Sequence, residues 1–123
     1  MGSMTQSLED YLETVYFLID SKGSACVRDV ALALNVKMPS VVKAIHELKS
    51  LELVTQEPYS SIELTPKGER LAKVVSGRHN LLCSFLIKLG VSPETADEDA
   101  CRMEHILSAE TLDKIRTYTE GKE

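Results

Sequence analysis

The feature that most constrains this fold is a pair of short helical patterns joined by a tight turn. Apolar residues recur every three or four positions over residues 27–34 and again from Met38 through Leu48, and Asn35-Val36 makes the turn between them. Pro39 stands in the first turn of the second pattern, where proline is tolerated. The segment predicts a helix-turn-helix, although an ordinary helical hairpin with solvated lysines fits the same residues.

A β-hairpin is predicted directly after these helices. Residues 53–56 and 62–64 have the composition of strands, and a polar turn at residues 57–61 separates them. Thr65-Pro66-Lys67-Gly68 then starts another helix, with Thr65 as N-cap and Pro66 in the first helical position. This order predicts a mainly α fold with a small β-wing, a winged helix-turn-helix, and favours it over the plain hairpin.

Helical patterns also flank this segment. The first runs from Ser7 to about Asp20, with Ser7 as its N-cap. After the wing, a long pattern runs from Pro66 to Leu89 and stops at Gly90, and shorter helices are predicted over residues 93–107 and 109–118. These later helices are too short to bury their own apolar faces well, so a dimer is expected. The predicted domains are residues 4–75 and residues 76–123.

The distribution of charge bears on the binding of nucleic acid. A formal charge of -5 at first argues against it, because phosphate contacts need Lys and Arg. Residues 22–78, however, hold nine Lys and Arg against six acids, a net charge of +3, so the remaining residues carry -8. A mildly basic centre between acidic ends suits a DNA-binding protein with carboxylate-rich cation sites.

The helix-turn-helix predicts which side chains reach double-stranded DNA. The second helix of such a unit lies in the major groove with its first turns at the base edges, and nearby lysines contact phosphates without reading sequence. The candidate contacts from the helices and the wing are Arg28, Lys37, Met38, Pro39, Ser40, Lys43, Lys49, Tyr59 and Ser60.

A set of potential metal ligands lies near the C-terminal end. Cys101, Glu104 and His105 have the spacing i, i+3 and i+4, which on a helix stacks a thiol, a carboxylate and an imidazole on one face. His79 lies on an earlier helical stretch. The first helix adds Asp10 and Glu13, and these residues meet the others only if the three helices pack together.

Each of these residues also has a purely structural interpretation. Asp10 could complete a capping box with Ser7, and Glu13 could be a solvated surface carboxylate. Cys101 and His105 could be packing groups, and packing is the interpretation that we prefer for Cys26 and Cys83.

The cysteines and the N-terminal residues indicate the compartment. The three cysteines are an odd set scattered through helical patterns, and nothing at the N-terminus has the pattern of a signal peptide or a membrane span. We expect a cytoplasmic protein with reduced thiols and no membrane partner.

Five motifs occur together in this chain, namely residues 9–16, Pro39-Ser40-Val41, residues 64–68, Arg78-His79-x-Leu81-Leu82 and residues 99–108. Together they make the chain resemble the diphtheria-toxin-repressor family, and within it the short manganese-transport-regulator branch. The resemblance spans nearly all of residues 6–118. It implies a homodimeric repressor that controls metal-ion homeostasis, in which Fe(II) or Mn(II) fixes the spacing of two winged helices and permits binding to a palindromic operator.

The resemblance also implies a set of metal ligands. Asp10, Glu13, His79, Glu104 and His105 match ligand positions of the manganese branch. Cys101 stands where that branch has glutamate and the iron-type repressors have cysteine, whereas Asp10 replaces the methionine of the iron type. The implied site is therefore a hybrid, and Cys83 and Asp97 fall at or near ancillary ligand positions of the iron type. The expected ion is Fe(II) or Mn(II), with Zn(II) or Co(II) possible in vitro.

Two other functional classes fit parts of the sequence. A winged-helix regulator that responds to thiol oxidation or to a small organic ligand would keep the DNA-binding residues and would use Cys101 or Cys83 as a redox thiol. A metal-dependent hydrolase is disfavoured, because Glu104-His105 lacks the His-Glu-x-x-His arrangement and a nucleophile with its base is missing. We therefore expect a regulator and not an enzyme.

Overall fold

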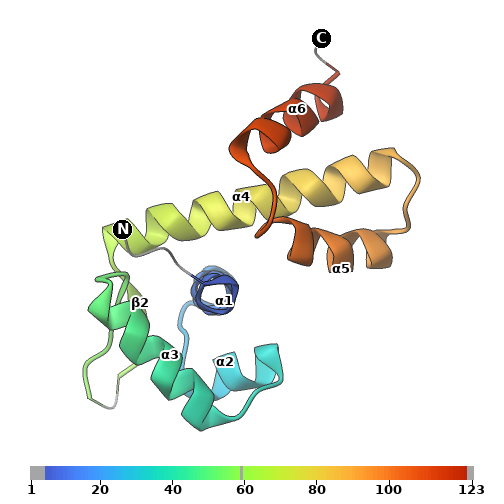
Figure 1. The fold of residues 1–123 in the computed structure, drawn as a ribbon. Coiled ribbons are helices and arrows are strands. Elements are labelled where there is room, and N and C mark those ends of the chain that lie inside the picture. The colour runs from blue at the N-terminus through green and yellow to red at the C-terminus, as the bar shows by residue number, and fades with distance from the viewer. Residues whose placement is uncertain (1–4, 59, 122–123) are drawn as a thin grey trace. The chain divides into compact units, whose positions relative to one another are not determined.

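The fold is mainly helical with one small sheet, as predicted. A computed structural model describes residues 5–58 and 60–121, and the chain divides into two compact units, the first ending at Lys73 and the second beginning at Val74. Among the described residues, no helix is long and apolar enough to cross a membrane. The elements are α1 (Gln6–Lys22), α2 (Val27–Leu34), α3 (Met38–Ser50), β1 (Val54–Thr55), β2 (Glu63–Leu64), α4 (Pro66–Lys88), α5 (Pro93–Met103) and α6 (Ala109–Thr119) (Figure 1).

The first unit packs α1, α2 and α3 around one apolar core. The four residues that the helical period assigns to the inner face of α3 are all buried, and burying a Leu, Ile or Val side chain contributes about 1.5–3 kcal/mol. The turn between α2 and α3 closes at Asn35, whose φ of 56° is left-handed, and the Val36 N–H donates to the Ala31 carbonyl over 3.0 Å. The predicted helix-turn-helix is therefore present with the predicted beginning and end of α2. The buried residues of α3 are Val41, Ala44, Ile45 and Leu48.

The wing is an antiparallel pair of two-residue strands. Val54 pairs with Leu64 and Thr55 with Glu63, so the paired segment is shorter than predicted. The segment that connects the two strands contains an internal hydrogen bond, in which the Gln56 side-chain amide donates to the Ser60 carbonyl over 3.1 Å. Tyr59, one of the predicted DNA contacts, lies outside the described residues.

The start of α1 corrects one prediction. Ser7 is not the N-cap, because Thr5 has the extended conformation of a cap and its hydroxyl accepts the Leu8 N–H over 3.1 Å. Ser7 therefore lies inside the first turn, and Asp10 is not the partner of a capping box built on it. The helix also runs past Asp20, to Lys22, where Gly23 ends it with a φ of 87°.

The second unit contains the C-terminal part of α4 together with α5 and α6. Gly90, with a φ of 104°, follows α4, and α5 then runs back beside it (Figure 1). Leu82, Ala100 and Leu112, one from each helix, form the buried core of this unit.

The predicted end of α5 is wrong by about four residues. The helix stops at Met103 and not near Leu107, because the chain must reach an extended conformation at Ser108, which caps α6 by accepting the Thr111 N–H over 3.1 Å. Glu104 is the C-cap of α5, and His105 follows in a tighter turn, with its N–H donating to the Arg102 carbonyl over 3.4 Å. Two of the predicted metal ligands thus lie just beyond the regular helix.

Candidate metal centre and nucleic-acid interface

Glu104 is the central residue of the predicted metal site. Its side chain is fully buried, and it is the one charged residue among the fully buried side chains of the described chain. A buried carboxylate is costly unless charge or hydrogen bonds compensate it. Positive charge near Glu104 would therefore stabilise this part of the second unit, in addition to the contacts that the carboxylate already makes.

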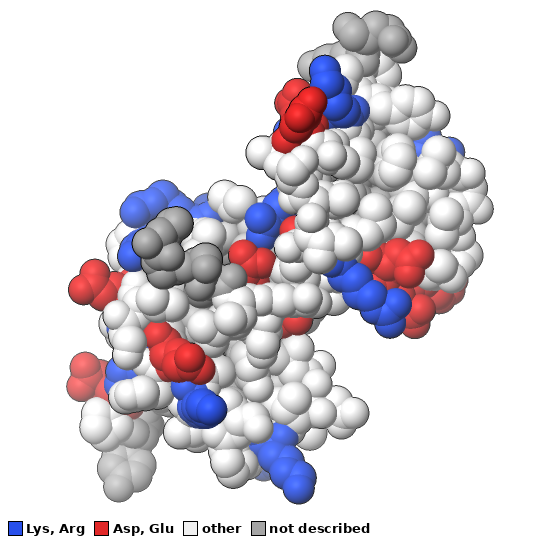
Figure 2. Space-filling view, viewed as in Figure 1, with Lys and Arg blue, Asp and Glu red and all other residues white. Residues whose placement is uncertain are grey.

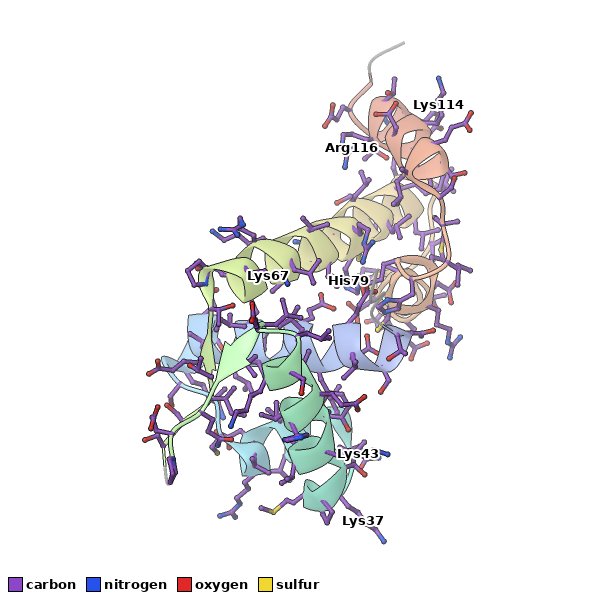
Figure 3. The ribbon with its side chains drawn as sticks, turned by 60° about the vertical axis from the view of Figure 1, so that its left-hand side comes forward. Lys37, Lys43, Lys67, His79, Lys114 and Arg116 are labelled. Atoms are coloured by element: carbon purple, nitrogen blue, oxygen red, sulfur yellow. The ribbon has the colours of Figure 1, made fainter. Side chains whose placement is uncertain are left out.

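Two imidazoles face this carboxylate. The Glu104 Oε1 atom lies 3.5 Å from His105 Nε2 and 3.9 Å from His79 Nδ1. His105 has only 2% of its side chain exposed and His79 has 19%, so both rings are largely withdrawn from water. His79 comes from α4, on the side that meets α5 in Figure 3. Packing of α5 against α4 therefore brings together residues that are 25 positions apart in the chain.

The thiol of Cys101 belongs to the same neighbourhood. Its Sγ atom lies within 4.8 Å of a Glu104 carboxylate oxygen, and Cys101 is exposed on α5. The i, i+3 spacing predicted this proximity, and the end of the helix at Met103 does not abolish it because Glu104 keeps right-handed helical dihedral angles. Of the six predicted ligands, His79, Cys101, Glu104 and His105 thus lie within the second unit.

The other two predicted ligands lie in the first unit. Asp10 and Glu13 are half-buried residues of α1, three positions apart and so on one face of that helix.

The donor pairs that Glu104 forms in the second unit fit divalent transition-metal ions. One ion binds nitrogen, oxygen and sulfur ligands at about 2.0–2.3 Å, so two donors on the same ion lie on the order of 3 to 4.5 Å apart. The donor separations of 3.5 and 3.9 Å around Glu104 are in that range. Two imidazole nitrogens, a carboxylate and a thiol are also the groups that Fe(II), Mn(II), Co(II) and Zn(II) bind.

Acidic side chains of α5 form a red group on the surface in Figure 2.

The predicted DNA contacts lie on the exposed surface of the first unit. Lys37 and Lys43 extend outward from α3 (Figure 3), and the first turn of that helix carries no acidic residue. Arg28, Lys37 and Met38 line one groove at the turn between α2 and α3. The described members of the predicted set that are exposed are Arg28, Lys37, Met38, Pro39, Ser40, Lys43, Lys49 and Ser60.

Two further residues of this surface were not predicted. Val42 has 56% of its surface exposed, and His46 is exposed one turn later. Both lie on the face of α3 opposite the buried stripe, beside Lys43. The helical period alone could have identified them, since positions 39, 42, 43 and 46 share that face.

Two sequence models of one protein family match nearly the whole chain. The model described as the N-terminal DNA-binding domain of iron-dependent repressors matches residues 3–62. The model described as the metal-binding and dimerisation domain of iron-dependent repressors matches residues 65–121.

Individual proteins agree with these matches. The transcriptional regulator MntR of Salmonella typhimurium is 42% identical over 113 residues, which are 92% of this chain and 72% of that protein. The crystal structure of T. acidophilum IdeR has a TM-score of 0.82 at 31% identity, over 98% of this chain and 56% of that one. The structure of the manganese regulator SloR has a TM-score of 0.82 at 26% identity, over 95% and 55%. The chain therefore spans little more than half the length of these two solved chains.

Proposed function

This chain belongs to the iron-dependent repressor family of metal-dependent transcriptional regulators, and we propose that it represses genes of metal-ion homeostasis when Fe(II) or Mn(II) is bound. The resemblance predicted from the sequence is thereby confirmed, and the family consists of regulators and not enzymes. The observation that carries the proposal is the buried Glu104 carboxylate with two imidazoles within 4 Å.

The proposed ligand set has six members. Glu104, His79 and His105 provide the buried donors, and Cys101 adds a thiolate from α5. Asp10 and Glu13 on α1 are assigned by their positions in the family motif. Support for this set comes from the donor types, which match the ligands that first-row divalent metals prefer.

The two ends of the chain have separate proposed roles. Residues 4–75 bind DNA, and residues 76–123 bind the metal and form a homodimer. Two of the proposed ligands, Asp10 and Glu13, belong to residues 4–75, and the other four belong to residues 76–123. Coordination of one metal site by both groups would restrict the position of each winged helix in the dimer. The residues of α1 and α4 thus couple metal binding to the spacing of two recognition helices. A two-fold dimer of this kind would read a palindromic operator in two half-sites, in the cytoplasm where the DNA lies.

The proposed DNA interface combines α2, α3 and the wing. The first turns of α3 would face base edges through Met38, Pro39 and Ser40, and the cations around them would contact phosphates. The exposure of these candidate contacts supports the assignment, since none of those that the structure describes is buried in the core. The complete proposed set is Arg28, Lys37, Met38, Pro39, Ser40, Lys43, Lys49, Tyr59 and Ser60.

Lys43→Ala is expected to weaken DNA binding to a similar extent on every sequence. One lost phosphate contact should lower the slope of log affinity against log salt by about 1, because one counterion fewer is released. Fluorescence anisotropy with duplexes of different sequence, at several salt concentrations, measures both quantities. The matched control is Lys114→Ala, which removes the same charge from the exposed surface of α6. An unchanged salt slope in the Lys43 variant would refute the phosphate contact.

Cys101→Ser is expected to weaken Fe(II), Co(II) and Zn(II) binding more than Mn(II) binding, because the thiolate is a softer donor than the hydroxyl that replaces it. Anaerobic titrations of each metal give the affinities, and loss of the sulfur-to-cobalt charge-transfer absorption reports the bond directly. Cys26→Ser is the control, because Cys26 is exposed and is not the packing residue that we expected from the sequence. It should change neither the metal affinities nor the cobalt absorption. If the Cys101 variant binds all four metals with the wild-type affinities, the thiolate is not a ligand.

The proposed function is tested by selecting fragments of the source genome on the purified protein with Mn(II) and, in parallel, with a chelator. We expect a two-fold symmetric motif to be enriched only with Mn(II). Enrichment of the same motif in both arms would contradict metal activation and would favour a regulator that responds to thiol oxidation or an organic ligand.

A further inference from the structure

The two nitrogens of His79 face two different carboxylates. Nε2 lies 2.9 Å from Asp97 Oδ1, and Nδ1 lies 3.9 Å from Glu104 Oε1. The two acids differ in their surroundings, because Asp97 has 70% of its side chain exposed and Glu104 has none. The His79 ring thus lies between an exposed carboxylate and a buried one.

The shorter contact determines which nitrogen can bind an ion. A neutral imidazole carries one N–H and one lone pair. The 2.9 Å separation is that of a hydrogen bond, and an ionised carboxylate can only accept, so this contact assigns the hydrogen to Nε2, which donates to Asp97. Nδ1 then presents its lone pair on the side of Glu104.

The fold explains why Asp97 is available for this contact. Asp97, Cys101 and Glu104 occupy positions i, i+4 and i+7, so they follow one side of α5. Burial of Leu82 and Ala100 in one cluster holds α4 against α5. The same packing therefore places Asp97 at one nitrogen of His79 and Glu104 near the other.

We propose that Asp97 is a positioning residue for His79, and that it acts from outside the ligand set. This inference rests on the proposed function, in which His79 binds the metal. A carboxylate that accepts the second N–H of a ligating histidine fixes the ring and its tautomer and makes the other nitrogen a better donor. An ion held at Nδ1 lies on the far side of the ring from Nε2, out of reach of Asp97. In this proposal Asp97 is not an ancillary metal ligand, although the resemblance places it near such a position.

The test compares Asp97→Ala and Asp97→Asn with the wild type. Outer-shell partners typically contribute 10- to 100-fold in metal affinity, and the exposure of Asp97 places the expected loss in Asp97→Ala at about tenfold. The number of Mn(II) ions bound per subunit should not change. Asp97→Asn keeps an oxygen acceptor and should recover most of the affinity. Glu98→Ala removes the same charge from the next, exposed position of α5 and should behave as wild type.

Nitrogen NMR of the metal-free protein at mildly alkaline pH provides a second measurement that does not depend on metal. The His79 ring should be in the Nε2–H form in the wild type and a mixture of tautomers in Asp97→Ala. Loss of one bound ion per subunit in Asp97→Ala would show that Asp97 is itself a ligand. Unchanged metal affinity and an unchanged His79 tautomer would show that His79 and Asp97 form only a surface contact. Either result overturns the inference. A wild type that binds no Mn(II) would instead overturn the proposed function itself.

Discussion

Glu104→Gln is expected to lower the affinity for Mn(II) and Fe(II) by more than about 100-fold, because even outer-shell partners of a metal contribute 10- to 100-fold. The substitution keeps the shape of the side chain but removes the negative charge that faces both imidazoles. Glu104 is more deeply buried than any other proposed ligand in the second unit, so water cannot replace the lost carboxylate at the metal. Isothermal titration under anaerobic conditions measures the affinities.

Two controls separate ligand loss from misfolding. Glu110→Gln makes the same exchange at an exposed residue of α6 and should bind metal as the wild type does. Circular dichroism of metal-free Glu104→Gln should show a folded protein, because the substitution keeps the shape and the hydrogen-bonding capacity of the side chain and avoids the cost of burying a charged carboxylate. A folded Glu104→Gln protein with wild-type metal affinity would show that Glu104 is not a ligand.

Gly68→Ala is expected to lower the free energy of unfolding by about 3 kcal/mol, at the upper end of what overpacking usually costs. A Cβ at this position would lie 1.9 Å from the Leu53 carbonyl oxygen and 2.8 Å from its carbonyl carbon. These are backbone atoms, and the same carbonyl accepts the Thr65 N–H over 3.1 Å, so neither side can move without breaking the start of α4. Urea denaturation at fixed protein concentration, with chelator present, measures the change.

Gly77→Ala is the matched control on the same helix. Nothing lies within 4 Å of a Cβ at Gly77, and alanine is favoured over glycine in a helix by about 0.8–1.0 kcal/mol. The same substitution should therefore stabilise the protein at one position of α4 and destabilise it at another. Equal effects at the two positions would mean that the close contact at Gly68 does not exist.

The helix-turn-helix was predictable because its signals are local. The apolar period gave α2 from Val27 to Leu34 and the start of α3 at Met38, and the N-cap at Thr65 is observed, with its hydroxyl accepting the Gly68 N–H over 2.9 Å. The errors lie at helix ends and in the length of the wing strands. Residue type favours Ser7 slightly over Thr5 as a cap, and only the path of the chain into the helix selects Thr5.

The arrangement of the proposed metal ligands was predictable in part. The spacing of Cys101, Glu104 and His105 places Glu104 near each of the other two, and the tighter turn after Met103 keeps both proximities. The roles of the two nitrogens of His79 were not predictable from the sequence, because the contact with Asp97 joins residues on two helices and depends on how α4 and α5 pack. The burial of Glu104 is likewise a tertiary property, and no pattern in the acidic α5 segment distinguishes Glu104 from its exposed neighbours.

The most direct test of the account is the affinity of the wild type for one operator duplex, measured by anisotropy with Mn(II), with Fe(II) under anaerobic conditions, and with chelator. A coupling of about 1–3 kcal/mol is typical of allosteric proteins, so metal should tighten operator binding roughly 5- to 150-fold, and the operator should tighten metal binding by the same factor. Equal operator affinity with metal and with chelator would contradict the claim that metal binding controls this protein.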